Sequence, residues 1–171
     1  VDSITLDEPM SGVISGQQFA LLYTNQGGHD AYVLDLASND LLEYRLENPA
    51  VSMHLAPTEE FAIALTRAEN GMGTGVGGLY DRSPGMEILD LTGDKAKSRA
   101  YLLEGQGIGL AFSATETDLH ALVLQQNVEY LYQLNLYTGA EETLDLSAPP
   151  VHIGSLPNGQ FYITHDTGLG L

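Results

Sequence analysis

The 171-residue chain is 43% hydrophobic and contains no cysteine, so disulfide bonds and thiolate metal sites are excluded. Asp and Glu number 23 against 6 Lys and Arg, and the formal net charge of −17 repels nucleic-acid phosphates and anionic membrane surfaces. No apolar run reaches the length of about 18 residues that a membrane helix needs. We therefore expect no nucleic-acid partner and no membrane insertion.

Short apolar segments separated by turn signals follow one another along the chain, and none shows a sustained helical period. Residues 2–7 read as a single strand. After it, an aromatic residue or leucine opens the second strand of each following group, at Phe19, Phe61, Leu119 and Phe161. These anchors stand 42, 58 and 42 residues apart, which indicates one repeated unit with an insertion in its middle copy.

A second signature marks the end of the third strand in each unit. It is an Asp or Asn followed by Leu, at Asp35, Asp90 and Asn135. The distance from the anchor to this residue is 16 in the first and third units and 29 in the second. The additional residues coincide with the glycine-rich stretch 70–78. The middle copy is therefore the same unit with a longer loop between its second and third strands.

Four short antiparallel strands repeated every ~42 residues are typical of β-propeller blades. A β-sandwich would show cleaner alternation and no fixed period. We predict an all-β propeller with three complete four-stranded blades at about 9–46, 51–103 and 108–146. Residues 2–7 would form the last strand of a preceding blade, and 151–171 a partial blade.

This set of strands does not close into a ring of complete blades. An open array would expose unpaired strand edges, which promote aggregation. We therefore expect the chain to be a segment of a larger ring. The remaining blades would come from further chain or from a second copy.

The clearest copies of the repeat motif are YQLNLYTG at 132–139 and LPNGQFYIT at 156–164. They resemble the YVTN-type propeller repeats of bacterial and archaeal surface and periplasmic proteins, and the resemblance covers nearly the whole chain. It implies a propeller fold and an extracytoplasmic location (periplasmic, secreted or at the cell surface), but no reaction. The chain contains no Trp, unlike WD40 repeats and tryptophan-docking quinoprotein repeats.

The glycine-rich insertion contains a G-x-G-x-x-G match at 73–78, but no helix follows it, so we interpret it as a loop and not as a dinucleotide site. Because the strands run alternately up and down, the loop 67–85 belongs to the rim formed by the 2→3 and 4→1 connections. It holds Arg67, Tyr80 and Arg82, and Arg and Tyr are favoured interface anchors. These are the candidate partner-binding residues. A tolerated surface insertion is the alternative.

Two of the five histidines, His152 and His165, are candidate ligand-binding residues. Asn158-Gly159 is the preferred dipeptide of a two-residue hairpin turn, and a turn centred on it would place the two histidines directly opposite each other. Two imidazoles so placed could share a cation, but a β-bulge would destroy the register, and Zn²⁺ would need further ligands. We therefore predict no complete metal site. His54 and His120 read as structural.

No G-x-S-x-G elbow, H-E-x-x-H motif or Ser-His-Asp set can be assembled, so the sequence identifies no catalytic residue and no cofactor. The 4→1 connections at 48–50, 106–107 and 149–150 also supply few polar groups. We expect a non-catalytic binding or scaffold propeller for a protein or small-molecule partner. The alternative is a lactonase-like or other hydrolytic propeller, which would need carboxylates and histidines around the mouth of a central channel.

Overall fold

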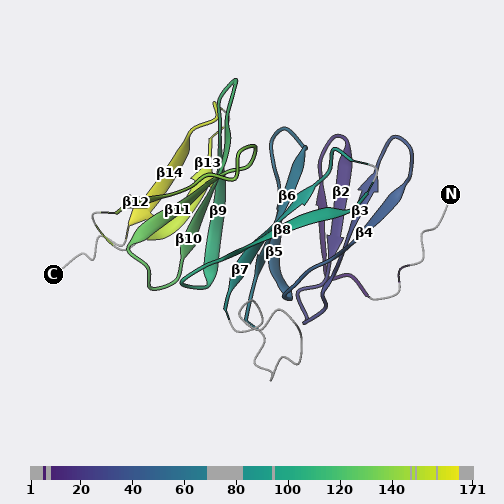
Figure 1. Ribbon diagram of the computed structural model, residues 1–171, viewed down its shortest axis with the longest axis horizontal. Coiled ribbons are helices and arrows are strands. Elements are labelled where there is room, and N and C mark those ends of the chain that lie inside the picture. The colour runs from purple at the N-terminus through teal and green to yellow at the C-terminus, as the bar shows by residue number, and fades with distance from the viewer. Residues whose placement is uncertain are drawn as a thin grey trace. The chain divides into compact units, whose positions relative to one another are not determined.

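The computed structural model describes residues 6, 9–68, 83–93, 95–146, 148, 150–156 and 158–165. Every regular element in this part of the chain is a β-strand, and the chain divides into two compact units, Val1–Tyr101 and Leu102–Leu171 (Figure 1). Within the described ranges no helix is long and apolar enough to cross a membrane. The prediction of an all-β fold is confirmed.

The first unit contains two four-stranded sheets, each in the strand order of the sequence. The first sheet consists of β1 (Gly12–Ser15), β2 (Phe19–Tyr23), β3 (Asp30–Asp35) and β4 (Leu41–Arg45). The second consists of β5 (Ala50–Leu55), β6 (Phe61–Thr66), β7 (Gly85–Asp90) and β8 (Lys97–Leu102), which ends at the boundary between the units.

The second unit contains one complete and one two-stranded sheet. The complete sheet consists of β9 (Gly107–Ala114), β10 (Leu119–Gln125), β11 (Tyr130–Asn135) and β12 (Glu141–Asp145). The smaller sheet pairs β13 (Pro150–Ser155) with β14 (Phe161–His165). Three four-stranded sheets in sequential order, followed by a partial one, are the predicted propeller blades.

The Asp/Asn-Leu signature has a structural cause in the turn after the third strand. The Asp35 carboxylate accepts hydrogen bonds from the N–H groups two and three residues further on, at 2.7 and 3.0 Å. The Asn135 side chain accepts the equivalent pair, both at 3.0 Å. Asp90 accepts the N–H two residues on at 2.9 Å. Asn39 and Gly139 close the first and third of these turns with left-handed φ angles of 64° and 75°, a conformation that Asn and Gly adopt readily.

The core of the first unit lies between its two sheets. All six residues of β6 are buried, as expected for a strand covered on both faces. The Tyr44 hydroxyl crosses from the first sheet to the second and donates a hydrogen bond to the carbonyl of Asp90 at 2.6 Å. Burial, with the nearby charge of Asp90, raises the pKa of Tyr44 to about 12. This hydrogen bond and the apolar contacts around it fix the two sheets against each other.

The second unit has its own apolar cluster, which joins the complete sheet to the β13–β14 pair. Its buried members include Leu122, Leu131 and Ile153. Two polar contacts add to it, from the Phe112 N–H to Ser155 Oγ at 2.8 Å and from the Ala114 N–H to the carbonyl of Gly159 at 3.2 Å. In contrast, all five residues of β12 are exposed. Among the residues described, no strand pairs with the outer edge of β14.

The register differs from the sequence prediction at one of the anchors. Phe19 pairs with Asp35 and Phe61 pairs with Asp90, as the repeat requires. In the third blade Asn135 pairs with His120 and not with the predicted anchor Leu119. The spacing from the anchor to the Asp or Asn is the same in the first and third units, so the sequence did not reveal that β10 is displaced by one residue in its pairing with β11. The predicted strand at 2–7, apart from residue 6, and the inserted stretch 70–78 lie outside the described residues.

Candidate functional site

The histidine pair expected in the last hairpin does not form. His152 lies opposite Thr164, and His165 lies opposite Pro150 beyond a bulge. Successive residues of a strand point to opposite faces, so His165 faces away from the side that His152 shares with Thr164. His152 stacks on Tyr162, with ring centroids 5.7 Å apart. The prediction of directly opposed histidines is wrong, and a ligand role for either one alone stays a prediction.

The turn of this hairpin explains the error. The Leu156 N–H donates to the carbonyl of Gln160 at 2.7 Å, and the Gly159 N–H donates to the carbonyl of Leu156 at 3.1 Å. Gly159 has a φ of 78°. Leu156 therefore pairs with Gln160 and Ser155 with Phe161, so each pair is shifted by one residue from the register of the expected two-residue turn. The bulge near the end of the ladder displaces His165 once more.

His29 and His165 both support 4→1 connections. Nδ1 of His29 lies 3.0 Å from the carbonyl oxygen of Leu46, which follows β4. Nδ1 of His165 lies 2.9 Å from the carbonyl oxygen of Ala148, which follows β12. Each ring therefore holds a connection between consecutive blades, which is a structural role.

The predicted partner-binding residues lie only partly within the described chain. Arg67 follows β6 directly and is exposed. Its backbone N–H donates a hydrogen bond to the carbonyl oxygen of Pro49 at 3.1 Å. Tyr80 and Arg82 lie outside the described residues. A shared partner surface for these three side chains therefore stays a prediction.

Glu87 is a buried carboxyl group that the sequence analysis passed over. It lies in β7 and is only 2% exposed. One oxygen accepts the Glu47 N–H at 2.5 Å, while Oε2 has no hydrogen-bond partner within the described residues. Burial is the main cause that raises the pKa of Glu87 to about 7, and the charge of Glu47 raises it further. Hydrogen bonds from the N–H groups of Glu47 and Asn48, and the charge of His29, act in the opposite direction. The available signal was a charged residue in the middle of a strand whose other interior residues are apolar.

A larger candidate site lies at the opposite rim of the first unit, between its two sheets. We call it the acidic hollow. It has a volume of about 750 Å³ and is lined by residues in or next to the 1→2 and 3→4 connections of both blades. Apolar side chains and four carboxylates line it together. The lining residues are Gln18, Phe19, Val33, Asp35, Asp40, Leu41, Leu42, Thr58, Glu59, Glu60, Leu91, Thr92 and Gly93.

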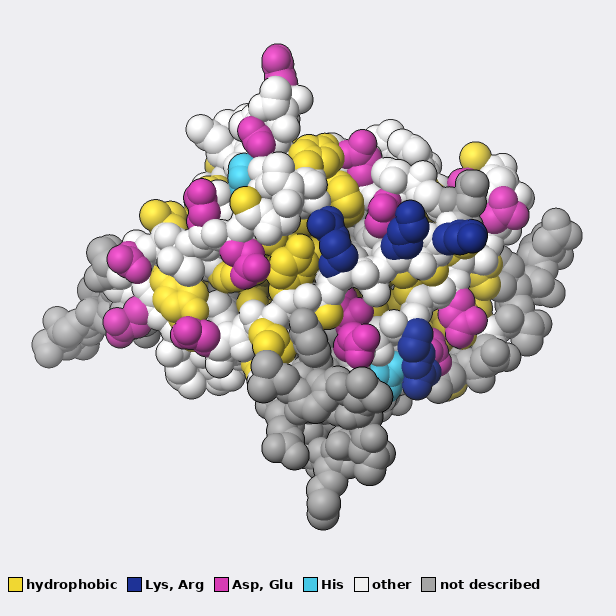
Figure 2. All heavy atoms as spheres, viewed as in Figure 1, with side chains coloured by type: hydrophobic (Ala, Val, Ile, Leu, Met, Phe, Trp, Pro, Cys, Tyr) yellow, Lys and Arg dark blue, Asp and Glu magenta, His cyan; other side chains and the backbone are white. Residues whose placement is uncertain are grey.

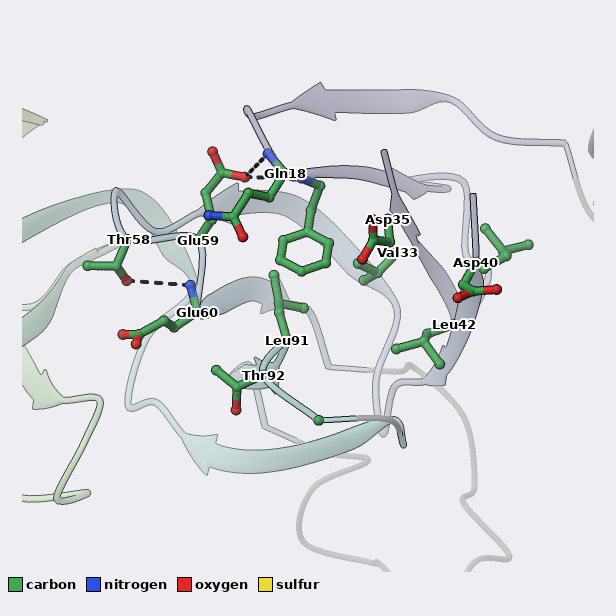
Figure 3. Close-up of a pocket in the computed structure, with 13 residues that line it drawn as sticks. Gln18, Val33, Asp35, Asp40, Leu42, Thr58, Glu59, Glu60, Leu91 and Thr92 are labelled. Carbon is green, nitrogen blue, oxygen red and sulfur yellow. Dashed lines mark hydrogen bonds between the residues drawn. The ribbon is translucent and has the colours of Figure 1, made fainter. Parts of the chain in front are cut away.

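Glu59 is the most firmly held of these carboxylates. It occupies a turn with a φ of 56° and reaches the β1–β2 turn of the preceding blade. Its oxygens accept the N–H groups of Gln17 at 2.6 Å, Gln18 at 2.8 Å and Phe19 at 3.1 Å. Figure 3 draws the hydrogen bond from Gln18. Burial opposes its ionisation, but the three donors outweigh burial and lower its pKa. The carboxylate therefore stays charged and fixed in position.

The remaining carboxylates surround an apolar floor. Leu91 lies between Glu59 and Glu60 on one side and Asp35 and Asp40 on the other (Figure 3). The N–H groups of the following turn, that of Ser38 first, lower the pKa of Asp35. Asp40 is exposed at the mouth. Fixed negative charge beside an apolar surface suits a group that is both cationic and partly apolar.

The chain as a whole is strongly acidic, although all six of its Lys and Arg residues belong to the first unit. Acidic side chains are spread over the visible face of the molecule, with Lys and Arg fewer in number (Figure 2). A field of this sign raises the local concentration of cations and repels anions.

No protein-family model matches the sequence, and no curated protein matches it. Solved structures do resemble the chain. They include dihydro-heme d1 dehydrogenase NirN (TM-score 0.61, 9% identity, 92% of this chain and 35% of that one). Hydrazine synthase of Kuenenia stuttgartiensis matches with a TM-score of 0.59 and 12% identity, and the match covers 86% of this chain and 53% of that one. The Cps50 (Swd1) β-propeller domain of Myceliophteria thermophila matches with a TM-score of 0.56 and 11% identity, and the match covers 92% of this chain and 54% of that one.

The chain is built of β-propeller blades. Identities of this size establish the fold alone, and the three proteins named differ widely in role. The chain spans about a third to a half of their lengths. The likeness supports a propeller in general and does not single out the YVTN type.

Proposed function

We propose that the protein is a non-catalytic binding propeller that works outside the cytoplasm and receives a cationic, partly apolar group of its partner in the acidic hollow. The observation that carries the proposal is the arrangement of fixed carboxylates around the apolar floor of that hollow. The partner is a protein or a small molecule with an ammonium or guanidinium group next to an apolar part.

The protonation states favour binding over catalysis at this site. An effective general base has a pKa near the working pH. Hydrogen bonds lower the pKa values of both Asp35 and Glu59, which makes them poor proton acceptors at neutral pH. The same hydrogen bonds hold the two carboxylates in place before a ligand arrives, so little conformational entropy is lost on binding.

A hydrolytic propeller is the second candidate, and Glu87 is the observation that favours it. A pKa of about 7 suits a general acid or base. However, Glu87 is almost fully buried, and one of its oxygens is occupied by the backbone of the 4→1 connection. A substrate could reach it only if that connection moved.

We also propose that the protein is located outside the cytoplasm and that this chain forms only part of a propeller ring. The repeat motif resembles that of surface and periplasmic propellers, and an acidic surface keeps such a protein soluble. The sheet β13–β14 has two strands where the other sheets have four. Further chain or a second copy would supply strands that pair with β14.

The test is calorimetric titration with hexylammonium, and with 1-hexanol as a neutral probe of similar size. We expect hexylammonium to bind more tightly than hexanol, with an affinity that falls as salt is added. Asp40→Lys reverses one charge at the mouth of the hollow and should weaken binding by about tenfold. Glu116→Lys makes the same change at an exposed turn in the second unit and serves as the matched control.

Equal weakening by both variants would attribute binding to net charge and contradict a site in the hollow. Hydrolysis of ester or lactone substrates that is lost in Glu87→Gln would favour the hydrolytic alternative. Binding of hexylammonium without turnover, sensitive to Asp40→Lys alone, is the result that the proposal expects.

A further inference from the structure

The few basic residues of the chain are concentrated on one strand of the first unit. Three of the six Lys and Arg stand at alternate positions, Lys95, Lys97 and Arg99, and no acidic residue lies between them. All five residues from 95 to 99 are exposed, and Lys97 and Arg99 lie in the first half of β8. Figure 2 shows Lys and Arg side chains in a row over this strand. We call residues 95–99 and the outer side of β8 the basic edge.

β8 is the last strand of its sheet. It ends the order β5-β6-β7-β8, so no strand of the described chain pairs with its outer side. Successive residues of a strand point to opposite faces, and Lys97 and Arg99 therefore project from the same face, about 7 Å apart along the strand. The basic edge thus combines backbone groups that can accept a further strand with positive charges at every second residue.

The second unit carries an edge of the opposite charge. No Lys or Arg occurs among residues 102–171, which make up this unit. Its strand β12 ends the order β12-β11-β10-β9, and all five residues of β12 are exposed. Three of them are acidic, Glu141, Glu142 and Asp145. We call the outer side of this strand the acidic edge.

The charges decide which outer strands can pair. Charged side chains on an outer strand commonly prevent it from pairing with other chains. This protection holds between edges of the same sign, because like charges that lie directly opposite each other are destabilising. Two basic edges therefore repel each other, and so do two acidic edges. A basic edge beside an acidic edge is stabilised by the same charges.

The other outer strands of the described chain do not match the basic edge. β4 carries one acidic and one basic residue, Glu43 and Arg45, and β14 carries no Asp, Glu, Lys or Arg. Protection alone would not need lysine, since the chain places acidic residues at most of its other charged positions. Among these strands β12 is the one whose charge is complementary to that of β8.

We propose that the basic edge of one copy of this chain pairs, as an added β-strand, with the acidic edge of a second copy. Backbone hydrogen bonds join the two strands, and the ion pairs select which edges meet. An antiparallel pairing with Lys97 opposite Asp145 matches every residue of β12 with a residue of β8. Arg99 then lies diagonally between Asp145 and Glu141, within reach of both carboxylates.

This pairing is head to tail. Each copy uses its basic edge toward one neighbour and its acidic edge toward another, so the contact builds rings or growing chains and not a closed two-fold dimer. None of residues 95–99 or 141–145 lines the acidic hollow. Failure of the edge pairing therefore leaves the binding proposal for that hollow intact, and the reverse also holds.

Sedimentation and light scattering of the complete chain test the proposal. At about 0.1 molar salt the Debye length is about 10 Å, which screens the repulsion between the net charges of two copies more than it weakens ion pairs in contact. We expect the average mass to rise with protein concentration there and to fall again toward about 1 molar salt. A chain that stays monomeric up to about 1 millimolar, on the order of the weakest specific binding, would overturn the proposal.

Two charge reversals identify the contact. Lys97→Glu and Asp145→Lys should each weaken self-association by about tenfold, because an attractive pair becomes a repulsive one. An equimolar mixture of the two variants should associate as the wild type does, since Glu at 97 of one variant then meets Lys at 145 of the other. Circular dichroism of each variant checks folding.

Asp145→Lys also separates edge pairing from net charge. It makes the acidic chain less negative, so repulsion between whole molecules falls, and yet the proposal expects weaker association. Glu116→Lys makes the same change of charge at an exposed turn of the second unit and should not weaken association. Equal effects of these two variants would attribute association to net charge and overturn the proposal. Association that survives both Lys97→Glu and Asp145→Lys would place the contact elsewhere, such as at β14, and would also overturn it.

Discussion

Glu87 gives the sharpest test of the electrostatics inside a blade. The substitution is Glu87→Gln, which keeps an oxygen acceptor for the Glu47 N–H and removes the ionisable group. The folded protein holds the proton of Glu87 up to a pKa of about 7, whereas the unfolded chain releases it near the ordinary value of 4.5. Between these values the folded state binds more protons, so stability falls as the pH rises.

The magnitude follows from the size of this difference. One pKa unit corresponds to about 1.4 kcal/mol, so ionised Glu87 lowers the free energy of unfolding by about 3 kcal/mol at pH 8 relative to pH 4. The contribution is fully present below about 4.5 and is lost as the pH rises through about 7. Glu87→Gln has no such loss. Relative to the wild type, the variant should gain about 3 kcal/mol over this range.

Urea unfolding followed by far-ultraviolet circular dichroism, at constant ionic strength from about pH 4 to about pH 8, measures this difference, because these limits lie on either side of the two pKa values. Comparison of the two proteins at each pH removes the repulsion among the many other carboxylates. Glu116→Gln, at an exposed turn, should run parallel to the wild type. Parallel curves for Glu87→Gln and the wild type would refute the buried, proton-holding state of Glu87.

Three further predictions test other parts of the structure. Glu59→Gln should lower stability at neutral pH by about 2 kcal/mol, because three N–H groups lose a charged acceptor. The difference from the wild type should shrink as the pH falls through the lowered pKa of Glu59, and urea unfolding of both proteins in a series of decreasing pH checks both statements. Gly159→Ala should lower the melting temperature, since its φ is 78° and a Cβ would clash with the carbonyl oxygen of Ala114. Gly93→Ala should change the melting temperature little, because its Cβ would make only ordinary van der Waals contacts with the Lys95 backbone, at 3.9 Å. Tyr80→Ala should weaken a partner that binds the inserted loop and leave the melting temperature nearly unchanged, as pull-down and calorimetry would measure.

The repeat made the fold predictable from the sequence. The anchors and the Asp/Asn-Leu steps recur because each has a local physical cause, and the Asp35 and Asn135 turns show it directly. A side chain that caps a turn two and three residues away leaves a pattern that can be read without tertiary information. Strand order follows because short turns join antiparallel neighbours.

The features that escaped the sequence analysis depend on exact register or on contacts between blades. One residue in the turn before Phe161 decides whether His152 faces His165, and the dipeptide Asn-Gly occurs in more than one turn type. Glu59 reaches its three donors across 40 to 42 residues of sequence. The burial of Glu87 depends on the 4→1 connection that covers it. No local pattern encodes such contacts.

The binding proposal is tested most directly by amide chemical shifts during a titration with hexylammonium. The N–H groups of Gln17, Gln18 and Phe19 donate to the Glu59 carboxylate, so a cation that approaches this carboxylate must alter their shifts. We expect these three amides and those of Thr92 and Gly93 to move together along one saturating curve, and to respond less in Asp40→Lys. Unchanged shifts at Gln17–Phe19 while other amides saturate would contradict binding in the acidic hollow.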